Sequence, residues 1–288
     1  MNQIKTVALL GLLSGLLIAI CYSVFGGVFG AAIGIAVAAV TNLGSWYYSD
    51  RIALAAYSAQ PVTSQQAPGL HRIVERLAQR AGIPKPAVYV LPGQAANAFA
   101  TGRDPEHAAV AVTEGIMRLL PEAELEGVIA HELTHIMNRD TLTQAVAATI
   151  AGAISFLAQM LSYAMWFGGA SRDEDGPNPL ALLATVILAP IAATVIQLGI
   201  SRTREFVADA GAAKLTGNPR ALASALQRLE ARAQQLPMAG NPAFAPLMIV
   251  NAMPKQFMAS LFSTHPSTEQ RIQRLMALET SAPAALGF

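Results

Sequence analysis

Residues 121–140 read PEAELEGVIAHELTHIMNRD and contain the motif HELTH at positions 131–135. Pro121 and the acidic residues directly after it are typical of a helix start, and apolar residues at helical spacing supply a face for burial. Two histidines four residues apart lie on the same face of a helix, so the rings of His131 and His135 can reach one metal ion. The stretch therefore predicts a buried helix that carries two metal ligands.

The residues around this pair predict the chemistry. Glu132 lies directly after the first histidine, where a carboxylate can take a proton from a metal-bound water. Glu205 on a second helix would complete the ligand set, although a glutamate beside Arg204 also forms surface ion pairs. Asp209, one turn later, could accept a hydrogen bond from a ligand histidine and fix its tautomer. Two histidines, one glutamate and an open fourth position are typical of a catalytic site with one Zn²⁺ per chain, which indicates a zinc-dependent peptidase.

The composition indicates an integral membrane protein. Of the 288 residues, 53% are hydrophobic and 13% are charged, whereas about 25% are charged in soluble domains. Four uncharged stretches are each long enough to cross a bilayer, which takes about 20 residues. They form two hairpins, with spans at 6–25 and 28–48 and at 143–167 and 179–200. Buried helices of a large soluble protein would not account for four such stretches.

Basic residues near the ends of the spans predict the orientation. The basic residues at the span ends are Lys5, Arg51, Arg139, Arg202 and Arg204. All of them lie on the side of the two termini, whereas the loop between the third and fourth spans contains only Arg172, with three acids. The first span is longer than the apolar region of a cleaved signal peptide, which has about 7–15 residues. Both termini and the metal site are therefore predicted to be cytoplasmic.

The remaining residues predict one water-soluble catalytic domain that the second hairpin interrupts. The expected division is a first hairpin at 1–50, the N-terminal half of the catalytic domain at 51–142, a second hairpin at 143–200 and the C-terminal half of the catalytic domain at 201–288. Strands are expected at 87–91, 97–101 and 108–113, and helices at 68–82, 121–140, 202–216, 219–235 and 267–278. Residues 238–254 are apolar with three prolines, which indicates a covering loop. The fold class is therefore α+β, with a mostly helical catalytic domain, a small sheet and four transmembrane helices.

The net charge and the cysteine content limit the classes of partner and of metal site that we expect. The net charge of +1 gives no electrostatic reason to expect nucleic acid. The single cysteine, Cys21, lies inside a predicted span, so neither an intrachain disulfide nor a thiol metal cluster is expected. The expected partners are the lipid bilayer and polypeptide substrates.

Four segments have features that are specific in combination: HELTHIMNRD at 131–140, NAFATG at 97–102, the helix that carries Glu205, and LFSTHP at 261–266. Together they resemble the HtpX family of bacterial membrane zinc metalloproteases, over nearly the whole chain. That family is related to the endoproteases that trim prenylated CAAX proteins. The resemblance implies a gluzincin with a zincin-like catalytic domain. It also implies zinc ligands at His131, His135 and Glu205, with Glu132 as the general base.

The resemblance also implies a cellular role and two further sites. The role is quality control at the bacterial inner membrane under stress, by cleavage of misfolded or damaged membrane proteins at their cytoplasmic side. Residues Asn97, Ala98, Phe99 and Ala100 match an edge strand of the family, which would bind the substrate backbone by strand addition. The alternative is an ordinary sheet strand.

His265 and Arg271 match a pair that lies near the scissile carbonyl in the related endoproteases. A cation or an N–H donor at that place would stabilise the oxyanion as water attacks. Otherwise His265 is a residue at a helix start and Arg271 is a surface charge.

Three alternatives to this function differ in what they require. An intramembrane protease is disfavoured because charged residues on both sides of the motif place it at or outside the membrane surface. A prenyl endoprotease of the CAAX type would enclose a chamber with more spans than the four expected here. A non-catalytic membrane scaffold would need a broken ligand set or a missing base, and this chain has neither.

Overall fold

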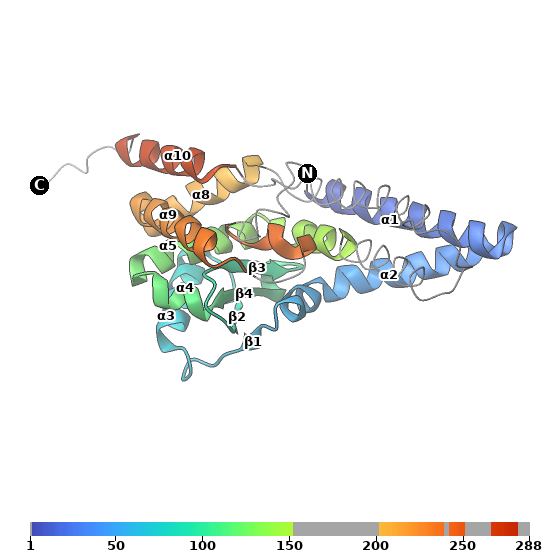
Figure 1. Ribbon diagram of the computed structural model, residues 1–288, viewed down its shortest axis with the longest axis horizontal. Helices are drawn as coiled ribbons and strands as arrows, with labels where there is room; N and C mark the ends of the chain where they lie inside the picture. Colours follow the sequence, from blue (N-terminus) through green and yellow to red (C-terminus); the bar gives the residue numbers. More distant parts are fainter. Residues whose placement is uncertain (1, 152–201, 239–241, 251–265, 282–288) are drawn as a thin grey trace, which may run out of the picture.

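The computed structural model describes residues 2–151, 202–238, 242–250 and 266–281. The protein is mostly helical with one small mixed sheet, and a long helical hairpin extends from one end (Figure 1). Of the predicted second hairpin, only residues 143–151 are among those described, and they are helical. His265 lies outside the described residues.

The hairpin consists of α1 (Asn2–Phe25) and α2 (Gly27–Ala56). Gly26 joins them with φ of 77°, a left-handed conformation that glycine adopts without steric cost. The helices approach closely, because a Cβ atom on Gly30 would lie 2.5 Å from the Cys21 carbonyl oxygen. Small residues at such a contact are typical of helix pairs in membranes. The predicted tight hairpin is therefore present, and α2 continues eight residues past the predicted end of its span.

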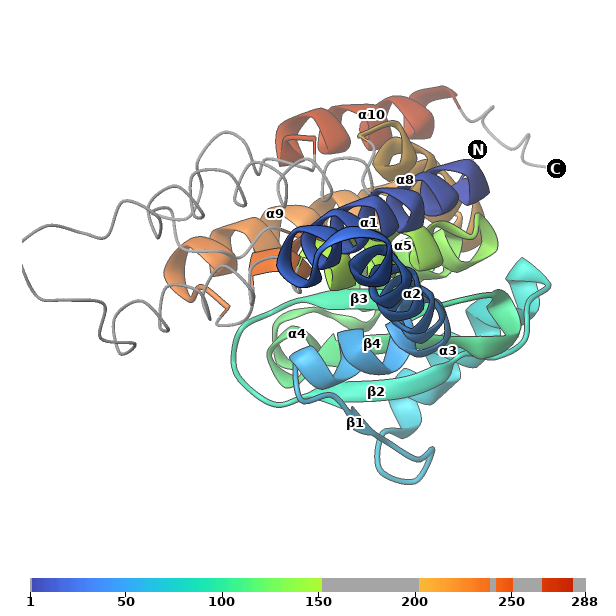
Figure 2. The same cartoon turned by 90° about the vertical axis from the view of Figure 1, so that its right-hand side faces the viewer.

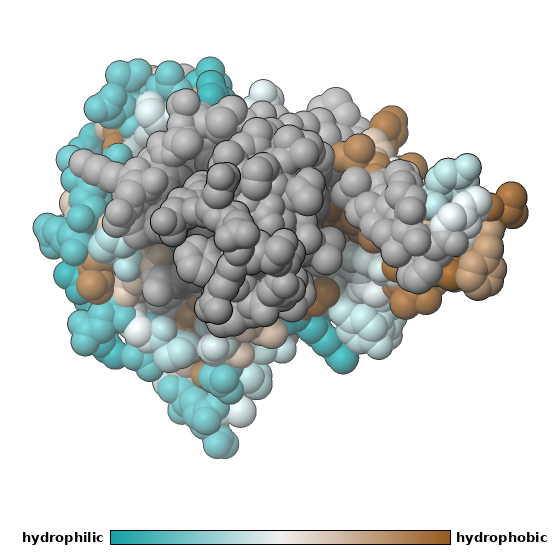
Figure 3. Space-filling view, turned by 45° about the vertical axis from the view of Figure 1, so that its right-hand side comes forward, coloured by the Kyte–Doolittle hydropathy of each residue, from teal (hydrophilic) through white to brown (hydrophobic). Residues whose placement is uncertain are grey.

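Among the described helices, α2 is the one that is long and apolar enough to cross a membrane, and only 17% of that stretch is buried. Large apolar side chains are exposed along it, including those of Val28, Phe29 and Val40. Figure 3 shows this hydrophobic surface on the hairpin, with hydrophilic surface at the opposite end of the molecule. The described helices therefore provide one candidate span, and the other three predicted spans stay predictions.

The sheet has the strand order β1-β2-β4-β3. Its strands are β1 (Gln60–Pro61), β2 (Ala87–Leu91), β3 (Ala98–Gly102) and β4 (Ala108–Thr113). β2 and β4 are parallel, and the other two pairs are antiparallel. The predictions for β2 and β4 are confirmed, and β3 begins one residue later than predicted. β1 was not predicted because two residues, one of them proline, carry no alternating pattern. β3 forms an edge of the sheet, as the strand-addition hypothesis requires.

The two faces of the sheet carry separate cores. One face packs against α3 (Pro68–Ala81), α5 (Glu122–Met137) and α9 (Pro219–Gln235), through residues that include Val110 and Ile129. The other face packs against the end of α2 and helix 140–151, through residues that include Phe99 and Ile150. Figure 2 looks at the molecule from the hairpin end, with α1 and α2 in front of the sheet. Because both faces are covered, all five residues of β3 are buried.

The helices of the catalytic domain match the predictions, with two differences. α3, α8 (Arg202–Thr216), α9 and α10 (Thr268–Ser281) lie where they were expected to within a few residues, whereas α4 (Glu114–Leu119) was not predicted. The predicted helix over 121–140 is too long, because α5 ends at Met137. Arg139 has a φ of 55°, which breaks the helix, and a new helix begins at residue 140.

The described part of the predicted covering loop lies along β3. It comprises the short 3₁₀ helix η2 (Pro242–Leu247) and residues 248–250. The Ile249 N–H donates a hydrogen bond of 3.0 Å to the Ala98 carbonyl oxygen, at the outer edge of β3. The loop therefore covers the beginning of the edge strand.

Candidate metal centre

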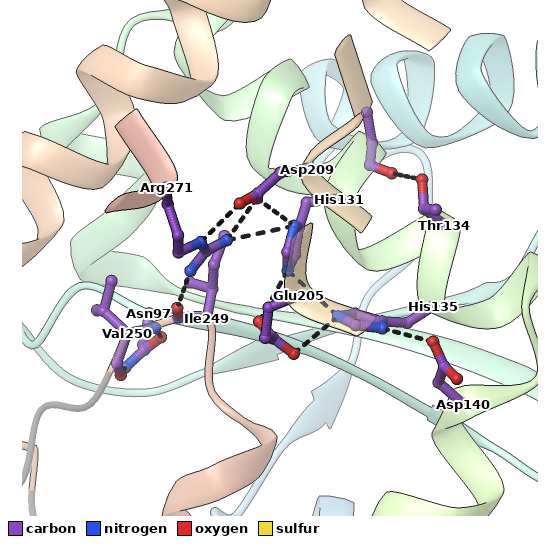
Figure 4. Close-up of polar contacts among 11 residues, drawn as sticks. Asn97, His131, Thr134, His135, Asp140, Glu205, Asp209, Ile249, Val250 and Arg271 are labelled. Carbon is purple, nitrogen blue, oxygen red and sulfur yellow. Dashed lines mark hydrogen bonds and ion pairs between the residues drawn. The ribbon is translucent and has the colours of Figure 1, made fainter. Parts of the chain in front are cut away.

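α5 and α8 bring three potential metal ligands together. The Nε2 atoms of His131 and His135 lie 3.2 Å apart. The two carboxylate oxygens of Glu205 lie 3.6 Å from His131 Nε2 and 3.5 Å from His135 Nε2. All three side chains are buried and present their ligand atoms to one point (Figure 4). The sequence prediction that Glu205 meets the two histidines therefore agrees with the geometry.

These separations fit one metal ion. Bonds of about 2.0–2.2 Å to nitrogen and oxygen, at tetrahedral angles, place the ligand atoms about 3.4 Å apart. The observed separations are 3.2–3.6 Å. A set of two imidazoles and one carboxylate can hold zinc and leaves a fourth tetrahedral position for water or substrate.

A glycine permits the close contact between α5 and α8. A Cβ atom on Gly211 would lie 2.7 Å from Thr134 Oγ1, closer than two such atoms approach. Thr134 cannot easily give way, because it is buried and its hydroxyl donates to the Ala130 carbonyl oxygen at 2.8 Å. The lack of a side chain at Gly211 therefore lets α8 lie close to Thr134 of α5, which brings Glu205 to the histidines.

Each histidine has a carboxylate at its other ring nitrogen. Asp209 Oδ1 lies 3.0 Å from His131 Nδ1, as the sequence predicted. Asp140 Oδ2 lies 3.1 Å from His135 Nδ1, an arrangement that was not predicted. A carboxylate accepts a hydrogen bond from Nδ1–H, which keeps the proton on Nδ1 and leaves Nε2 free to bind a metal. The signal that could have identified Asp140 is an acid shortly after the motif, but the predicted helix over 121–140 pointed its side chain away from His135.

Arg271 lies beside His131 and is buried. Its Nε and Nη2 donate to the two oxygens of Asp209 at 2.8 and 2.7 Å, and its Nη1 donates to the Ile249 carbonyl oxygen at 3.0 Å. Nη2 also lies 3.3 Å from His131 Nδ1, on the side of the ring away from the metal ligand atoms. The alternative of a surface charge at Arg271 is therefore wrong.

The charges of this cluster shift its pKa values. Burial alone would raise the pKa of Asp209, but the charge and hydrogen bonds of Arg271 outweigh it and lower the pKa to about 2. Burial alone would lower the pKa of His131, but hydrogen bonds to Asp209 and Glu205 raise it to about 9. Without a metal the site thus holds a proton, which a bound cation would displace.

Glu132 lies between the histidines and the edge strand. Its side chain is 2% exposed, and this burial raises the pKa of its carboxyl, while the two histidines act in the opposite direction. The Ala100 N–H of β3 lies close enough to this carboxylate to lower its pKa, against the effect of burial. A carboxyl group with a raised pKa accepts a proton more readily than an ordinary glutamate does and can return it.

The predicted substrate strand lies next to this base but is partly covered. The side chain of Asn97 is buried, and its Nδ2 donates to the Val250 carbonyl oxygen at 2.9 Å. The Val250 N–H donates back to Asn97 Oδ1 at 3.4 Å, and Ile249 occupies the Ala98 carbonyl oxygen. Residues 249–250 therefore lie where a substrate backbone would pair with Ala98.

Comparisons with known proteins agree with this geometry. Residues 64–279 match peptidase family M48. A protein described as a protease HtpX homologue, from Trichormus variabilis, is 71% identical over 284 residues, which cover 98% of each chain. The homologue from Nostoc punctiforme is 69% identical over 283 residues, also 98% of each chain. The homologue from Pyrococcus furiosus is 54% identical over 240 residues, 83% of each chain.

A solved structure shares the fold. The crystal structure of Ste24p from S. mikatae superposes with a TM-score of 0.51 at 20% sequence identity. The match covers 95% of this chain and 65% of Ste24p, so the chain spans about two-thirds of the length of that protein. At this level of identity the likeness concerns the fold alone.

Proposed function

Because the chain belongs to peptidase family M48 and, within it, to the HtpX family of metalloendopeptidases, we propose that it is a zinc endopeptidase of the bacterial cytoplasmic membrane. Its substrates would be misfolded or damaged membrane proteins, which it cleaves on the cytoplasmic side during stress. The observation that carries the proposal is the convergence of two imidazole Nε2 atoms and one buried carboxylate beside Glu132.

We assign zinc binding to His131, His135 and Glu205. Zinc, when bound, supplies a Lewis acid that polarises the scissile carbonyl and acidifies water. Glu132 takes the proton of the attacking water and returns it to the leaving amine, a role that its burial and raised pKa favour.

The scissile carbonyl oxygen becomes negatively charged as water attacks, and a donor or a cation must stabilise that charge. The guanidinium nitrogens of Arg271 already donate to Asp209 and Ile249. We therefore assign Arg271 to hold Asp209 and His131 in place, and His265 is the candidate that stabilises the developing negative charge. His265 belongs to the segment outside the described residues, so this assignment rests on the resemblance to related endoproteases.

Substrate would bind along the outer edge of β3, over Asn97, Ala98, Phe99 and Ala100. Strand addition uses backbone hydrogen bonds and demands little of the substrate sequence, which suits an enzyme that removes damaged proteins. The contact between Glu132 and the Ala100 N–H supports this place, because it puts the base within reach of a strand on that edge. Pairing at Ala98 would require the substrate to replace Ile249.

The hairpin supports a membrane location. α2 exposes large apolar side chains to its surroundings, and such a surface is costly in water. We propose four spans in two hairpins, with both termini and the catalytic domain in the cytoplasm, according to the distribution of basic residues. This placement gives the enzyme access to the cytoplasmic loops of membrane proteins.

The experiment that tests the proposal measures cleavage of casein by the purified protein in detergent, with zinc added up to one ion per chain. We expect activity to rise with zinc and to level off at one equivalent. Glu132→Gln should abolish cleavage and keep zinc, because the amide preserves the shape but accepts no proton. His135→Ala should lose zinc and activity together. Activity near the parent level in the Glu132→Gln protein would exclude the proposed mechanism.

A further inference from the structure

Asp140 contacts a metal-ligand histidine and an arginine at the same time. Its Oδ2 lies 3.1 Å from His135 Nδ1, and its Oδ1 lies 3.6 Å from Arg204 Nη1. The side chain of Asp140 is 2% exposed and that of Arg204 is 10% exposed. In Figure 4, Asp140 lies beside His135, at the opposite end of the site from Asp209 and Arg271.

The contact depends on the break after α5. On an unbroken helix, five residues advance the side-chain direction by about 500°, so Asp140 would point about 140° away from His135. The left-handed conformation of Arg139 ends the helix and turns the chain, and Asp140 begins the next helix facing back toward the imidazole. A non-glycine residue in this conformation is uncommon and carries a steric cost.

The two ligand histidines thus have matching supports. Asp209 contacts His131, and Arg271 in turn pairs with Asp209. In the same way Asp140 contacts His135, and Arg204 in turn pairs with Asp140. A carboxylate at Nδ1 fixes the tautomer and orientation of a ligand imidazole and increases its basicity. In each case an arginine forms an ion pair with the buried carboxylate.

Asp140 and Arg204 also lie at the two ends of one long segment. Residues 141–203 separate them in the sequence, and this range contains both spans of the predicted second hairpin. Arg204 directly precedes Glu205, the third candidate ligand. The ion pair therefore brings the start and the end of this segment together beside the metal site.

We propose that Asp140 is a positioning residue that orients His135 toward the metal, and that Arg204 holds Asp140 across the base of segment 141–203. The inference rests on the proposed metal site and adds a second carboxylate to it. Its consequence is that pairing of the two ends of this segment, at Asp140 and Arg204, is required for full metal affinity.

The test measures zinc affinity by competition with a chelator, and the visible absorption spectrum of the Co²⁺-substituted protein. We expect Asp140→Ala to lower zinc affinity about 10–100-fold, as changes behind a ligand histidine do. The Co²⁺ spectrum should change as well, because the imidazole loses its fixed orientation. Asp140→Asn should lose less zinc affinity than Asp140→Ala, since its amide oxygen can still accept the hydrogen bond from Nδ1–H. Arg204→Gln should also lose less zinc affinity than Asp140→Ala.

The control is Glu126→Gln on α5, the helix of the two histidines. It removes an ion pair of 3.0 Å with Arg76 of α3 and contacts neither histidine. It should keep the zinc affinity and the Co²⁺ spectrum of the parent. The inference is wrong if Asp140→Ala binds zinc as the parent does, or if the control loses as much affinity. It is also wrong if Asp140→Ala and Arg204→Gln lose equal affinity with unchanged spectra, because the ion pair alone would then account for the effect. A parent protein that binds no metal would overturn the proposed function itself.

Discussion

Removing Arg271 should destabilise the protein through the charge that it leaves behind. In Arg271→Met, the carboxylate of Asp209 loses two hydrogen bonds of 2.8 and 2.7 Å, and the Ile249 carbonyl oxygen loses one of 3.0 Å. The side chain of Asp209 is only 3% exposed, so water does not replace these donors. Breaking a buried ion pair by removing one partner costs about 3–5 kcal/mol. For a chain of this size we expect the melting temperature to fall by about 6–20 °C.

A second substitution distinguishes the cost of the unpaired Asp209 charge from the cost of the packing that Arg271→Met removes. In the double variant Arg271→Met with Asp209→Asn, no unpaired charge is left in the interior, so the double variant should be more stable than Arg271→Met alone. The assay is thermal unfolding of the metal-free protein in detergent, with Glu132→Gln present in every variant to prevent self-cleavage. A double variant whose loss equals the sum of the two single losses would refute the reasoning, as would an Arg271→Met protein that melts with the parent.

The pH dependence of the same pair has a defined sign. Burial works against ionisation of Asp209, but Arg271 outweighs it and lowers the folded-state pKa from 3.8 to about 2. The stabilisation is therefore complete above about pH 4 and is lost as the pH falls through about 2. The difference in melting temperature between the parent and Asp209→Asn should shrink over that interval. A constant difference from pH 5 to pH 2 would contradict the lowered pKa.

Three further predictions concern the third ligand, the helix contact and the topology. Glu205→Ala should reduce zinc content sharply, because two histidines and water make a poor site; full zinc content in that variant would mean that another acid is the third ligand. Gly211→Ala should cost about 1–3 kcal/mol of stability and lower zinc affinity by separating α8 from α5. Gly69→Ala, where a Cβ atom meets nothing within 4 Å, is the control and should do neither. A cysteine at Ser171 should react with an impermeant thiol reagent in intact cells and one at Ser267 should not; the reverse pattern would invert the topology.

Local patterns in the sequence were sufficient for most individual elements. Helices α8 and α9 and strands β2 and β4 have the predicted bounds, because apolar spacing and flanking turn residues act over a few neighbouring residues. The pairing of His131 with His135 on one face is equally local, since it follows from the helical repeat alone. The break at Arg139 was missed, because nothing in its neighbours requires a left-handed arginine.

The sequence by itself thus determined the motif, the tight turn of the first hairpin and the type of chemistry. Tertiary structure decided which distant side chains meet: Glu205 reaches the histidines through the α5–α8 contact at Gly211, and Arg271 is buried against Asp209. It also decided that Asp140 turns back to His135 and that Ile249 covers the edge of β3. The physical reason is that a helix or strand pattern reports which face of an element is buried. The partner on that face depends on how closely two backbones approach, and the local sequence does not encode that distance.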